Sequence, residues 1–598
     1  MCRSITLNAA PATMSYNLNK LAAGQETKTG KALRNFLPYL RPDRSTLFGA
    51  LFAILISTSM NLCIPFLIGH TIDVYVTHKD YHGVLLFSGI LFGIFLVSLT
   101  ASYFQTSLMG TVGQNILYRL RNDVFSRLQK LPIAFFNQNK AGDLISRINN
   151  DTDKLNQFFA QSLVQFIGGF ASMIGAAIFL LSIHFTLGIA AIAPAILLLI
   201  ITRITGPIVK RKNAENLKST GGMSAEIQES LNNFKVIIAF NRRDYFRKRF
   251  DIANNEQYRT AVTAGLVNNF FMPIFSLCAN LAQLAVLAYG IYLISQHEFS
   301  IGLLISYLSY CSYFYNPMRQ FAILYTNFQV AMAGWDRISH ILNMESDLHV
   351  IPAATKETQA PLLAFNDVNF HYPDGKDILH HISFEMEKGK TYALVGPTGG
   401  GKTTTASLIA RLYDPTGGEV LLDGRDIRSF TDEERTQKIG FILQEPFLFS
   451  GNIYENIIYG NKKYQHYSVD QLQEVIRTTG LDTLLTRFDG GLETPVLSSG
   501  DSLSLGQKQL IAFMRAVLRE PELLVLDEAT ANIDTVTEQL LEEILHKLPS
   551  HTTRVIIAHR LNTIENADEI FFINAGEIVR AGSFSHAMNM LLHHERNS

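Results

Sequence analysis

Cysteine is scarce in this sequence, and its placement excludes two kinds of site. The four cysteines among 598 residues, Cys2, Cys63, Cys278 and Cys311, show neither the paired spacing of a disulfide framework nor the spacing of metal ligands. The last three fall in apolar stretches, where cysteine behaves as a small buried hydrophobic residue. Cysteine chemistry is therefore not expected to carry the function.

Charge is also scarce. Charged residues make up 17% of the chain and hydrophobic residues 47%, whereas a soluble domain has roughly 25% charged residues. Part of the chain is therefore expected to lie in lipid. The 51 basic and 52 acidic residues give a net charge of -1, which argues against nucleic-acid binding because that function usually requires a basic excess. The length predicts at least two domains.

Long apolar segments recur before about residue 350 and are absent after it. Each is close to the roughly 20 residues that cross a bilayer, and together they are too many to be buried soluble helices. We predict six spans, at about 46–70, 84–106, 159–182, 185–207, 270–295 and 301–325. The predicted domains are a flexible cytoplasmic tail at 1–30, a transmembrane domain at 31–342, a linker at 343–361 and a second domain at 362–598.

Basic residues orient these spans. They gather before the first span, between the second and third, and between the fourth and fifth, whereas the opposite loops carry almost none beyond Lys79. The positive-inside rule places both termini in the cytoplasm of a multi-pass membrane protein. The two long basic segments have helical periodicity, so we expect helices that extend far beyond the membrane. Residues 32–42 suit either a short amphipathic helix along the membrane surface or a plain helical lead-in to the first span.

A glycine-rich turn between a strand pattern and a helix pattern matches the phosphate-binding motif G-x-x-x-x-G-K-[ST]. Its backbone N–H groups and the following helix N-terminus suit phosphate oxygens. Lys402 is expected to reach the β- and γ-phosphates of ATP, and the Thr403 hydroxyl to bind Mg²⁺. The residues expected to bind ATP here are Gly396, Pro397, Thr398, Gly399, Gly400, Gly401, Lys402, Thr403 and Thr404.

A second apolar strand, in LLVLDEAT, ends in two carboxylates. Asp527 is expected to hold Mg²⁺ directly or through water, and Glu528 to polarise the attacking water as a general base. An acidic pair that only begins a loop is the weaker interpretation, because a phosphate-binding motif lies upstream. The two motifs together predict a P-loop ATPase.

The remaining motifs of this half resemble the nucleotide-binding domain of ABC transporters from end to end, in the family's order. They are Tyr372 in FNDVNFHYPDG, Gln444 in GFILQEPFLF, LSLGQ at 503–507, Asp534 in ATANIDTVTE and His559 in VIIAHRLNTI. The resemblance implies an α/β P-loop fold with an α-helical signature subdomain.

The same resemblance implies a role for each of these residues. Tyr372 stacks on adenine, Gln444 senses Mg²⁺ and the membrane domain, and His559 contacts the γ-phosphate. Ser504, Gly506 and Gln507 form the signature, and Asp534 lies in the loop across which two such domains communicate. The implied catalytic residues are thus Glu528, His559, Lys402 and Gln444, and the implied Mg²⁺ ligands are Thr403, Gln444 and Asp527. For His559 alone, a structural role after an apolar strand is the alternative.

The whole chain resembles the exporter subfamily in which each half has six spans and one ATPase domain, as in multidrug and lipid-A exporters. Residues 131–155 look like its first cytoplasmic coupling region, with Phe135, Phe136, Gly142 and Arg147 at matching places. Residues 226–250 look like the second, which in that family docks on the partner's ATPase domain. Phe234 and Phe240 are the candidate contacts, with ordinary helix packing as the alternative.

Two sets of residues within the spans have alternative interpretations. Tyr307, Tyr310, Tyr313 and Phe314 form either an aromatic wall for an amphipathic substrate or, as the stronger expectation, contacts within the helix bundle. Asn280 and Gln283 either hydrogen-bond to a neighbouring helix or line the pathway.

The signature departs from the family's common LSGGQ form at Leu505. The family implies a dimer that sandwiches two ATP molecules, each between one chain's P-loop and the other chain's signature. A leucine there would hinder the approach to the partner's γ-phosphate, which favours a heterodimer whose partner has the standard signature. A homodimer that tolerates Leu505 is the alternative. Gly400 replaces the family's usual serine and is expected to be harmless.

We therefore expect ATP-driven export or flipping of amphipathic substrates, such as drugs or lipids, across a bacterial plasma membrane. Closure of two nucleotide-binding domains would be coupled to alternating access. A regulatory or channel-like protein, or an importer with the exporter fold, are the alternatives. A soluble ATPase that acts on DNA or ribosomes is excluded by the spans.

Overall fold

The computed structural model describes residues 16–18, 29–352, 360–373, 375–497, 503–527, 535–557, 566–582 and 585–586. They form two compact units. One comprises the described residues of Met1–Gly24, Gln129–Ala141 and Met344–Ser598, and the other those of Gln25–Leu128 and Gly142–Asn343. We call the first the ATPase unit and the second the helical unit.

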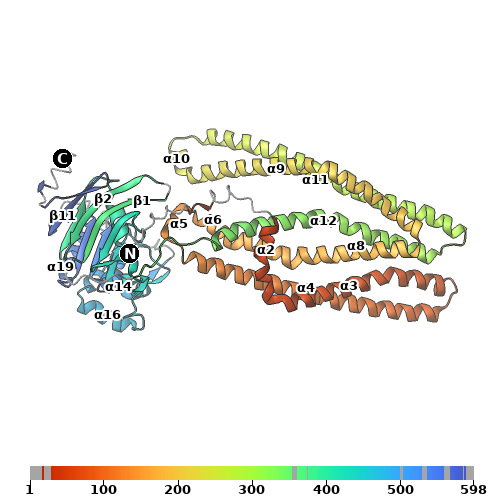
Figure 1. The fold of residues 1–598 in the computed structure, drawn as a ribbon, viewed down its shortest axis with the longest axis horizontal. Coiled ribbons are helices and arrows are strands. Elements are labelled where there is room, and N and C mark those ends of the chain that lie inside the picture. The colour runs from red at the N-terminus through yellow and green to blue at the C-terminus, as the bar shows by residue number, and fades with distance from the viewer. Residues whose placement is uncertain are drawn as a thin grey trace, which may run out of the picture. The chain divides into compact units, whose positions relative to one another are not determined.

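The helical unit consists of long helices joined by short turns. Its helices are α2 (Thr29–Leu40), α3 (Arg44–Thr71), α4 (Tyr81–Leu128), α6 (Ala141–Ser146), α7 (Thr152–Gln157), α8 (Leu163–Ile183), α9 (Phe185–Asn232), α10 (Phe234–Ala239), α11 (Arg243–Ser295) and α12 (Ile301–Leu342). Short 3-10 or π-helical turns lie at Arg41–Asp43, Ile72–Val76, Arg147–Asp151 and Phe158–Ser162. Figure 1 shows α9 and α11 side by side, with α10 at the turn between them.

In the part of the chain that the structure describes, five helical segments are long and apolar enough to cross a membrane, namely Arg34–Val76, Tyr81–Leu128, Ala141–Ile183, Phe185–Asn232 and Arg243–Ser295. They contain the first five predicted spans. The 53 residues of α11 correspond to about 80 Å at 1.5 Å per residue, well beyond the roughly 30 Å of hydrocarbon. The expected helical extensions are therefore present.

The sixth predicted span falls in α12, which is one continuous helix of 42 residues but is not among the five apolar segments. Its tyrosines lower its apolar character, and their hydroxyls are satisfied by backbone carbonyls of neighbouring helices. Tyr310 Oη donates to Leu62 O at 2.7 Å, Tyr315 Oη to Ala191 O at 2.9 Å and Tyr307 Oη to His184 O at 2.8 Å. A six-span arrangement thus remains a prediction for α12.

The predicted aromatic cluster of this span packs inside the bundle. Tyr307 and Tyr310 are fully buried, and Phe314 is 8% exposed. Tyr310 stacks on Phe179 of α8 with ring centroids 4.9 Å apart. These three rings are therefore used in helix packing, and only Tyr313 remains partly exposed.

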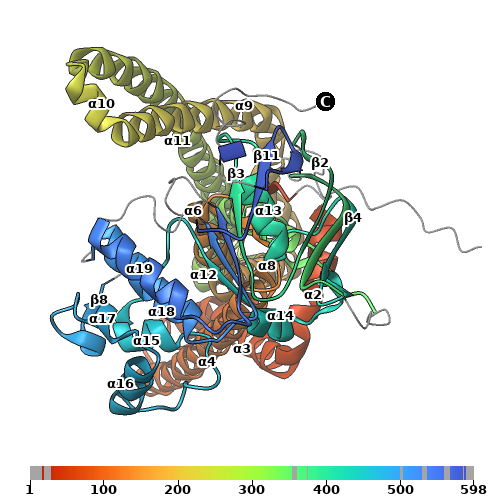
Figure 2. The ribbon, with the colours of Figure 1, turned by 90° about the vertical axis from the view of Figure 1, so that its left-hand side faces the viewer.

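The ATPase unit is an α/β fold of three sheets with helices around them (Figure 2). Its strands are β1 (Leu363–His371), β2 (Asp377–Met386), β3 (Thr391–Val395), β4 (Gly417–Leu422), β5 (Arg425–Asp426), β6 (Ile439–Ile442), β7 (Gly451–Asn452), β8 (Pro495–Val496), β9 (Leu523–Asp527), β10 (Thr553–Ile557), β11 (Glu569–Asn574) and β12 (Glu577–Arg580). Its helices are α5 (Ile133–Gln138), α13 (Lys402–Ile409), α14 (Asp432–Lys438), α15 (Ile453–Ile458), α16 (Val469–Thr478), α17 (Asp482–Leu485), α18 (Leu505–Val517) and α19 (Thr535–Lys547), with short turns at Ile427–Ser429 and Gly491–Glu493.

The largest sheet has the strand order β12-β11-β3-β10-β9-β6, and only β12 runs antiparallel to its neighbour. A four-stranded antiparallel sheet has the order β2-β1-β4-β5. Side chains of a strand alternate between its two faces, so Tyr392 and Leu394 of β3 face one apolar core while Ala393 and Val395 face another. The central strand is buried on both faces, as expected for a parallel sheet.

The observed units differ from the predicted domains in two places. Gln129–Ala141, predicted to belong to the transmembrane domain, groups with the ATPase unit. Within the predicted flexible tail, Tyr16 and Leu18 are fully buried. The side chain of Asn139 explains both, because its amide donates to Tyr16 O at 2.9 Å and accepts from Leu18 N at 3.1 Å. A flexible tail is therefore not the correct description of residues 16–18.

Candidate ATP site

The predicted phosphate-binding motif forms a turn between β3 and α13, as its sequence requires. Gly396 and Gly401 have φ angles of 145° and 116°, which L-residues with a side chain rarely adopt. Lys402 is 5% exposed, and its Nζ donates to Gly396 O at 2.9 Å and Pro397 O at 3.0 Å. The ammonium group therefore lies over the turn in which phosphate oxygens would bind.

Gly400, where the family usually has serine, is more constrained than the sequence suggested. A Cβ atom at this position would lie 2.7 Å from Ile573 O and 3.1 Å from Pro397 O. Gly400 O also accepts a hydrogen bond from Gly576 N at 3.1 Å. The end of β11, which contains Ile573, and the turn after it at Gly576 are thus packed directly against the phosphate-binding turn, and a side chain at Gly400 would displace them.

Two of the three predicted Mg²⁺ ligands, Thr403 and Asp527, lie close together although they are distant in sequence. The Thr403 hydroxyl donates to Asp527 Oδ1 at 3.4 Å, and Asp527 is 4% exposed. A hydroxyl and a carboxylate are hard oxygen donors of the kind that Mg²⁺ uses when most of its ligands are water and phosphate. The described residues contain no group of three or more His, Cys, Asp or Glu arranged for a metal.

Sheet order explains why motifs far apart in sequence converge here. The parallel strands β6, β9, β10 and β3 are consecutive neighbours, and Asp527 is paired with Ile557, which in turn is paired with Leu394. Ligands of open α/β sheets bind outside the carboxyl ends of the strands. The phosphate-binding turn follows β3, Asp527 ends β9, and exposed Gln444 comes two residues after β6.

Three predicted site residues lie outside the described residues. They are Glu528, which directly follows Asp527 in the chain, Asp534 and His559. Their roles remain predictions.

The predicted adenine-stacking residue lies next to the phosphate-binding helix. Tyr372 Oη is 3.2 Å from Thr404 Oγ1, and the ring meets that of Tyr413 edge-on with centroids 5.0 Å apart. Tyr372 therefore adjoins the phosphate-binding helix, and its ring packs edge-on against that of Tyr413.

The signature residues form the start of α18. Ser504 is its N-cap and accepts from Gln507 N at 3.2 Å, while Gln507 Oε1 accepts from Ser504 N at 2.9 Å, a reciprocal capping box. Leu505 is the first residue of the helix and is half-buried. Among the described residues, no hydrogen bond joins Ser504, Gly506 or Gln507 to the phosphate-binding turn at 396–404.

Sequence reasoning missed a path that joins the first coupling region to this site. Asn137 of α5 donates to Tyr413 Oη at 2.8 Å, and Tyr413 contacts Tyr372. Burial raises the pKa of the Tyr413 phenol, so this hydroxyl stays protonated at neutral pH. An asparagine next to aromatic residues was the only local signal, and it does not identify a partner 276 residues away.

Arg515 of α18 was also missed. Its Nε donates to Asn456 O at 2.7 Å and its Nη1 to Phe447 O at 3.1 Å. Phe447 lies three residues after Gln444, so this guanidinium joins the signature helix to the glutamine loop. Burial lowers the pKa of Arg515, yet an arginine remains charged at neutral pH.

The coupling residues predicted from resemblance have different surroundings. Phe135 is fully buried beside Tyr16, whereas Phe136 is 44% exposed. Gly142 has open space around it, and Arg147 is buried with an ion pair to Asp143 at 3.1 Å. In the second region, Phe234 and Phe240 are 55% and 73% exposed, so packing within this chain does not account for them.

A P-loop, an acidic strand end and a capped signature helix, in a chain with at least five membrane-length helices, define an ATP-driven membrane transporter. Residues 47–318 match the family model for the ABC transporter transmembrane region, and residues 379–531 match that for the ABC transporter ATPase domain. The chain belongs to the ABC transporter family, as an exporter half-transporter.

The curated relatives agree with this assignment. An uncharacterized ABC transporter ATP-binding protein of Bacillus subtilis, YfiC, is 33% identical over 96% of this chain and 94% of its own length. A multidrug resistance ABC transporter of Lactococcus lactis is 30% identical over 82% and 83%. A fatty acid ABC transporter of Mycobacterium bovis is 31% identical over 84% and 79%. The chain is therefore an ATP hydrolase whose activity is coupled to transport.

Proposed function

We propose that this chain is one half of a dimeric exporter that moves or flips amphipathic substrates, such as drugs or lipids, across a bacterial plasma membrane with both termini in the cytoplasm. The observation that carries the proposal is the meeting of Thr403 and Asp527, 3.4 Å apart, beside a phosphate-binding turn in a chain with membrane-length helices. This is the donor set of a Mg²⁺-dependent nucleotide site.

Mg²⁺, when bound with ATP, would supply a positive charge between the β- and γ-phosphates. Thr403, Asp527 and Gln444 are the residues that would hold it. Lys402 would bind the phosphates, Glu528 would accept a proton from water, and His559 would contact the γ-phosphate. Tyr372 would orient the nucleotide through its base.

A dimer is part of the proposal because, as far as the described residues show, the signature of this chain has no hydrogen bond to its own phosphate-binding turn. A γ-phosphate in a water-excluding site needs donors on both sides, and a second chain would supply them through Ser504, Gly506 and Gln507. The exposed rings of Phe234 and Phe240 support docking of α10 on that second chain. Leu505 favours a heterodimer with a partner that has the standard signature.

Flux measurements in proteoliposomes test the proposal. The purified full chain, alone and with a candidate partner, is expected to move a fluorescent amphiphile out of the leaflet facing its ATPase units only when ATP and Mg²⁺ are present. The variant E528Q is the matched control. Flux that does not depend on ATP would favour the channel-like alternative, and flux in the reverse direction would favour an importer.

A further inference from the structure

Helix α12 carries polar side chains along one exposed face. Ser309, Ser312, Asn316 and Arg319 follow one another at steps of three or four residues, the spacing of one helix face. Asn316, Arg319 and the adjacent Gln320 are exposed. Between residues 305 and 323, α12 exposes no large apolar side chain among its described residues.

The neighbouring helix α11 has a matching face. Ser276, Asn280 and Gln283 are spaced four and three residues apart, and the first two are exposed. Cys278 and Ala282, on the other side of the same helix, are buried. Gln283 Nε2 donates to Ser312 Oγ at 3.2 Å, so the two stripes meet. We call these residues the α11–α12 polar face: Ser276, Asn280, Gln283, Ser309, Ser312, Asn316, Arg319 and Gln320.

The polar face lies at membrane depth if α12 begins at the outer membrane surface, as the proposed orientation requires. Arg319 comes 18 residues after Ile301, the first residue of α12, which corresponds to about 27 Å at 1.5 Å per residue. The hydrocarbon layer is about 30 Å thick. Ser309, 8 residues after Ile301, lies at about 12 Å, so the face runs from within the hydrocarbon layer to its inner edge at Arg319. Polar side chains within the layer are costly in lipid and therefore face a protein interior or a water-filled pathway.

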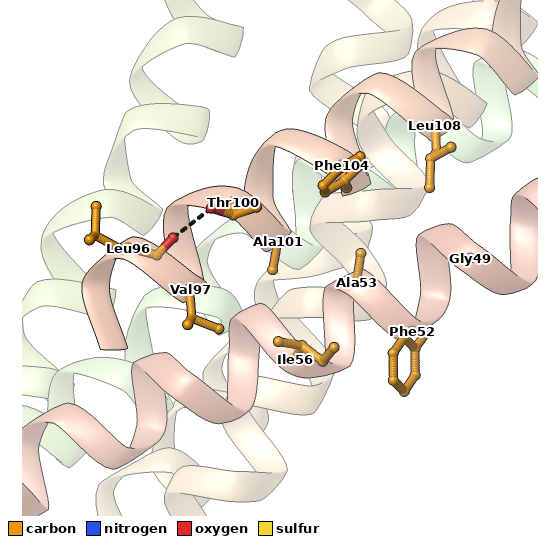
Figure 3. Close-up of a pocket in the computed structure, with 10 residues that line it drawn as sticks. All are labelled: Gly49, Phe52, Ala53, Ile56, Leu96, Val97, Thr100, Ala101, Phe104 and Leu108. Carbon is orange, nitrogen blue, oxygen red and sulfur yellow. Dashed lines mark hydrogen bonds between the residues drawn. The ribbon is translucent and has the colours of Figure 1, made fainter. Parts of the chain in front are cut away.

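A groove between α3 and α4 has the opposite character. Its cavity of about 480 Å³ is lined by apolar side chains such as Phe52, Ile56 and Leu108, which are drawn in Figure 3. Its one hydroxyl, that of Thr100, donates within its own helix to Leu96 O at 2.8 Å. This groove suits acyl chains and offers no group that would bind a polar head group.

The charge of the polar face has one sign. Residues 260–295 and 301–335 contain no aspartate or glutamate, and Arg319 has neither a hydrogen bond nor an ion pair among the described residues. A guanidinium presents a planar fork of donors that matches a carboxylate or a phosphate. The face therefore has a cation without an internal counter-ion, next to neutral amide and hydroxyl groups that donate hydrogen bonds.

We propose that the α11–α12 polar face is a substrate site for the anionic head group of an amphiphile, and that Arg319 forms the ion pair. The head group is a carboxylate or a phosphate. Asn316 and Gln320, within one turn of Arg319, supply further donors, while the apolar tail remains in contact with lipid or with the bundle. The inference narrows the substrate class of the proposed exporter and rests on its proposed orientation.

Arg203 provides a matched control. It comes 18 residues after Phe185, the first residue of α9, and is exposed. Among the described residues it has neither a hydrogen bond nor an ion pair. Its neighbours Leu199, Ile200 and Ile204 are 61%, 52% and 66% exposed, so the surface around Arg203 is apolar. Arg203 therefore has the same depth and charge as Arg319 but no polar side chains beside it comparable to the α11–α12 polar face. Its side chain is expected to extend toward the membrane–water boundary.

Photo-crosslinking without ATP tests the site. The full chain in nanodiscs of uncharged phosphatidylcholine is exposed to a long-chain fatty acid that carries a diazirine, and labelling of residues 260–335 is measured. R319Q is expected to lower labelling about tenfold, because one charge-assisted contact is lost. R203Q is expected to label like the wild type, and R319K to retain most of the labelling. N316D, which places an anion one turn before Arg319, is expected to lower labelling as much as R319Q does. This second variant tests the site if R319Q does not fold.

Competition identifies the head group. Lysophosphatidic acid that competes better than an unlabelled fatty acid identifies a phosphate, and the reverse identifies a carboxylate. The proposal is overturned if an alkylamine of the same tail length competes equally well, if R203Q loses as much labelling as R319Q, or if neither R319Q nor N316D changes it. Because no ATP is present, labelling is independent of ATP-driven flux, and failure of the proposed export function would be seen separately in proteoliposomes.

Discussion

Asn137 of α5 donates a hydrogen bond to the hydroxyl of Tyr413 at 2.8 Å, and Tyr413 in turn holds Tyr372 edge-on at 5.0 Å. Tyr372 reaches Thr404 of the phosphate-binding helix at 3.2 Å. The first coupling region thus has a continuous set of contacts to the residue expected to stack on adenine. These contacts could couple the first coupling region to the nucleotide site if α5 has two positions and each favours a different position of the Tyr372 ring.

The Asn137–Tyr413 bond is expected to affect coupling more than hydrolysis. Y413F keeps the ring and removes the hydroxyl, at a cost of about 1 kcal/mol. Substrate-stimulated ATPase activity is expected to fall severalfold while basal activity changes little. Y454F is the matched control, because it also removes a tyrosine hydroxyl that makes one hydrogen bond in the same unit, in this case as a donor to Tyr467 O. Equal effects of Y413F and Y454F on stimulation would exclude a specific role for Asn137.

Glu528 is expected to be the general base. E528Q should bind ATP like the wild type, because the amide retains the shape of the carboxylate, while hydrolysis at this site falls about a hundredfold or more. Nucleotide binding and phosphate release in the purified dimer measure the two effects. If E528Q does not change ATP turnover in a dimer in which only this site is active, Glu528 is not the general base.

Thr403 is expected to set the Mg²⁺ dependence. T403A removes the hydroxyl beside Asp527 and should raise the Mg²⁺ concentration for half-maximal ATPase activity by at least about tenfold. T403S keeps the hydroxyl and should restore most of the affinity. A Mg²⁺ titration at fixed ATP measures this change, and identical curves for T403A and T403S would contradict the metal role.

Leu505 is expected to hinder closure on a partner's nucleotide. L505G should raise the ATPase activity of a dimer in which this signature faces a competent phosphate-binding turn. Glycine inside a helix costs about 1 kcal/mol, so V469G is the control: Val469 likewise follows a capping-box serine, at the start of α16. If L505G gives no gain in ATPase activity and loses no more activity than V469G does, the result would favour the alternative that Leu505 is a tolerated variation in a homodimer.

Short-range patterns in the sequence were sufficient for most of the fold and for a prediction of the nucleotide site. The phosphate-binding motif, Asp527 and the signature are local in sequence, since each needs only a strand end, a turn or a helix start. Apolar length likewise identified the membrane helices. The division into units could not be read in this way, because Asn139 joins Gln129–Ala141 and residues 16–18 to the ATPase unit through contacts distant in sequence.

What the sequence by itself determined was therefore the class of transporter, which follows from residue type, spacing and order, and the same features predict the chemistry of its ATP site. Only the tertiary structure decided that Asn137 meets Tyr413 and that Gln283 meets Ser312. It also decided that Tyr307 and Tyr310 face inward while Asn316 and Arg319 face outward on the same helix. The physical reason is that a helical pattern defines faces, but the neighbours of each face depend on how distant segments pack.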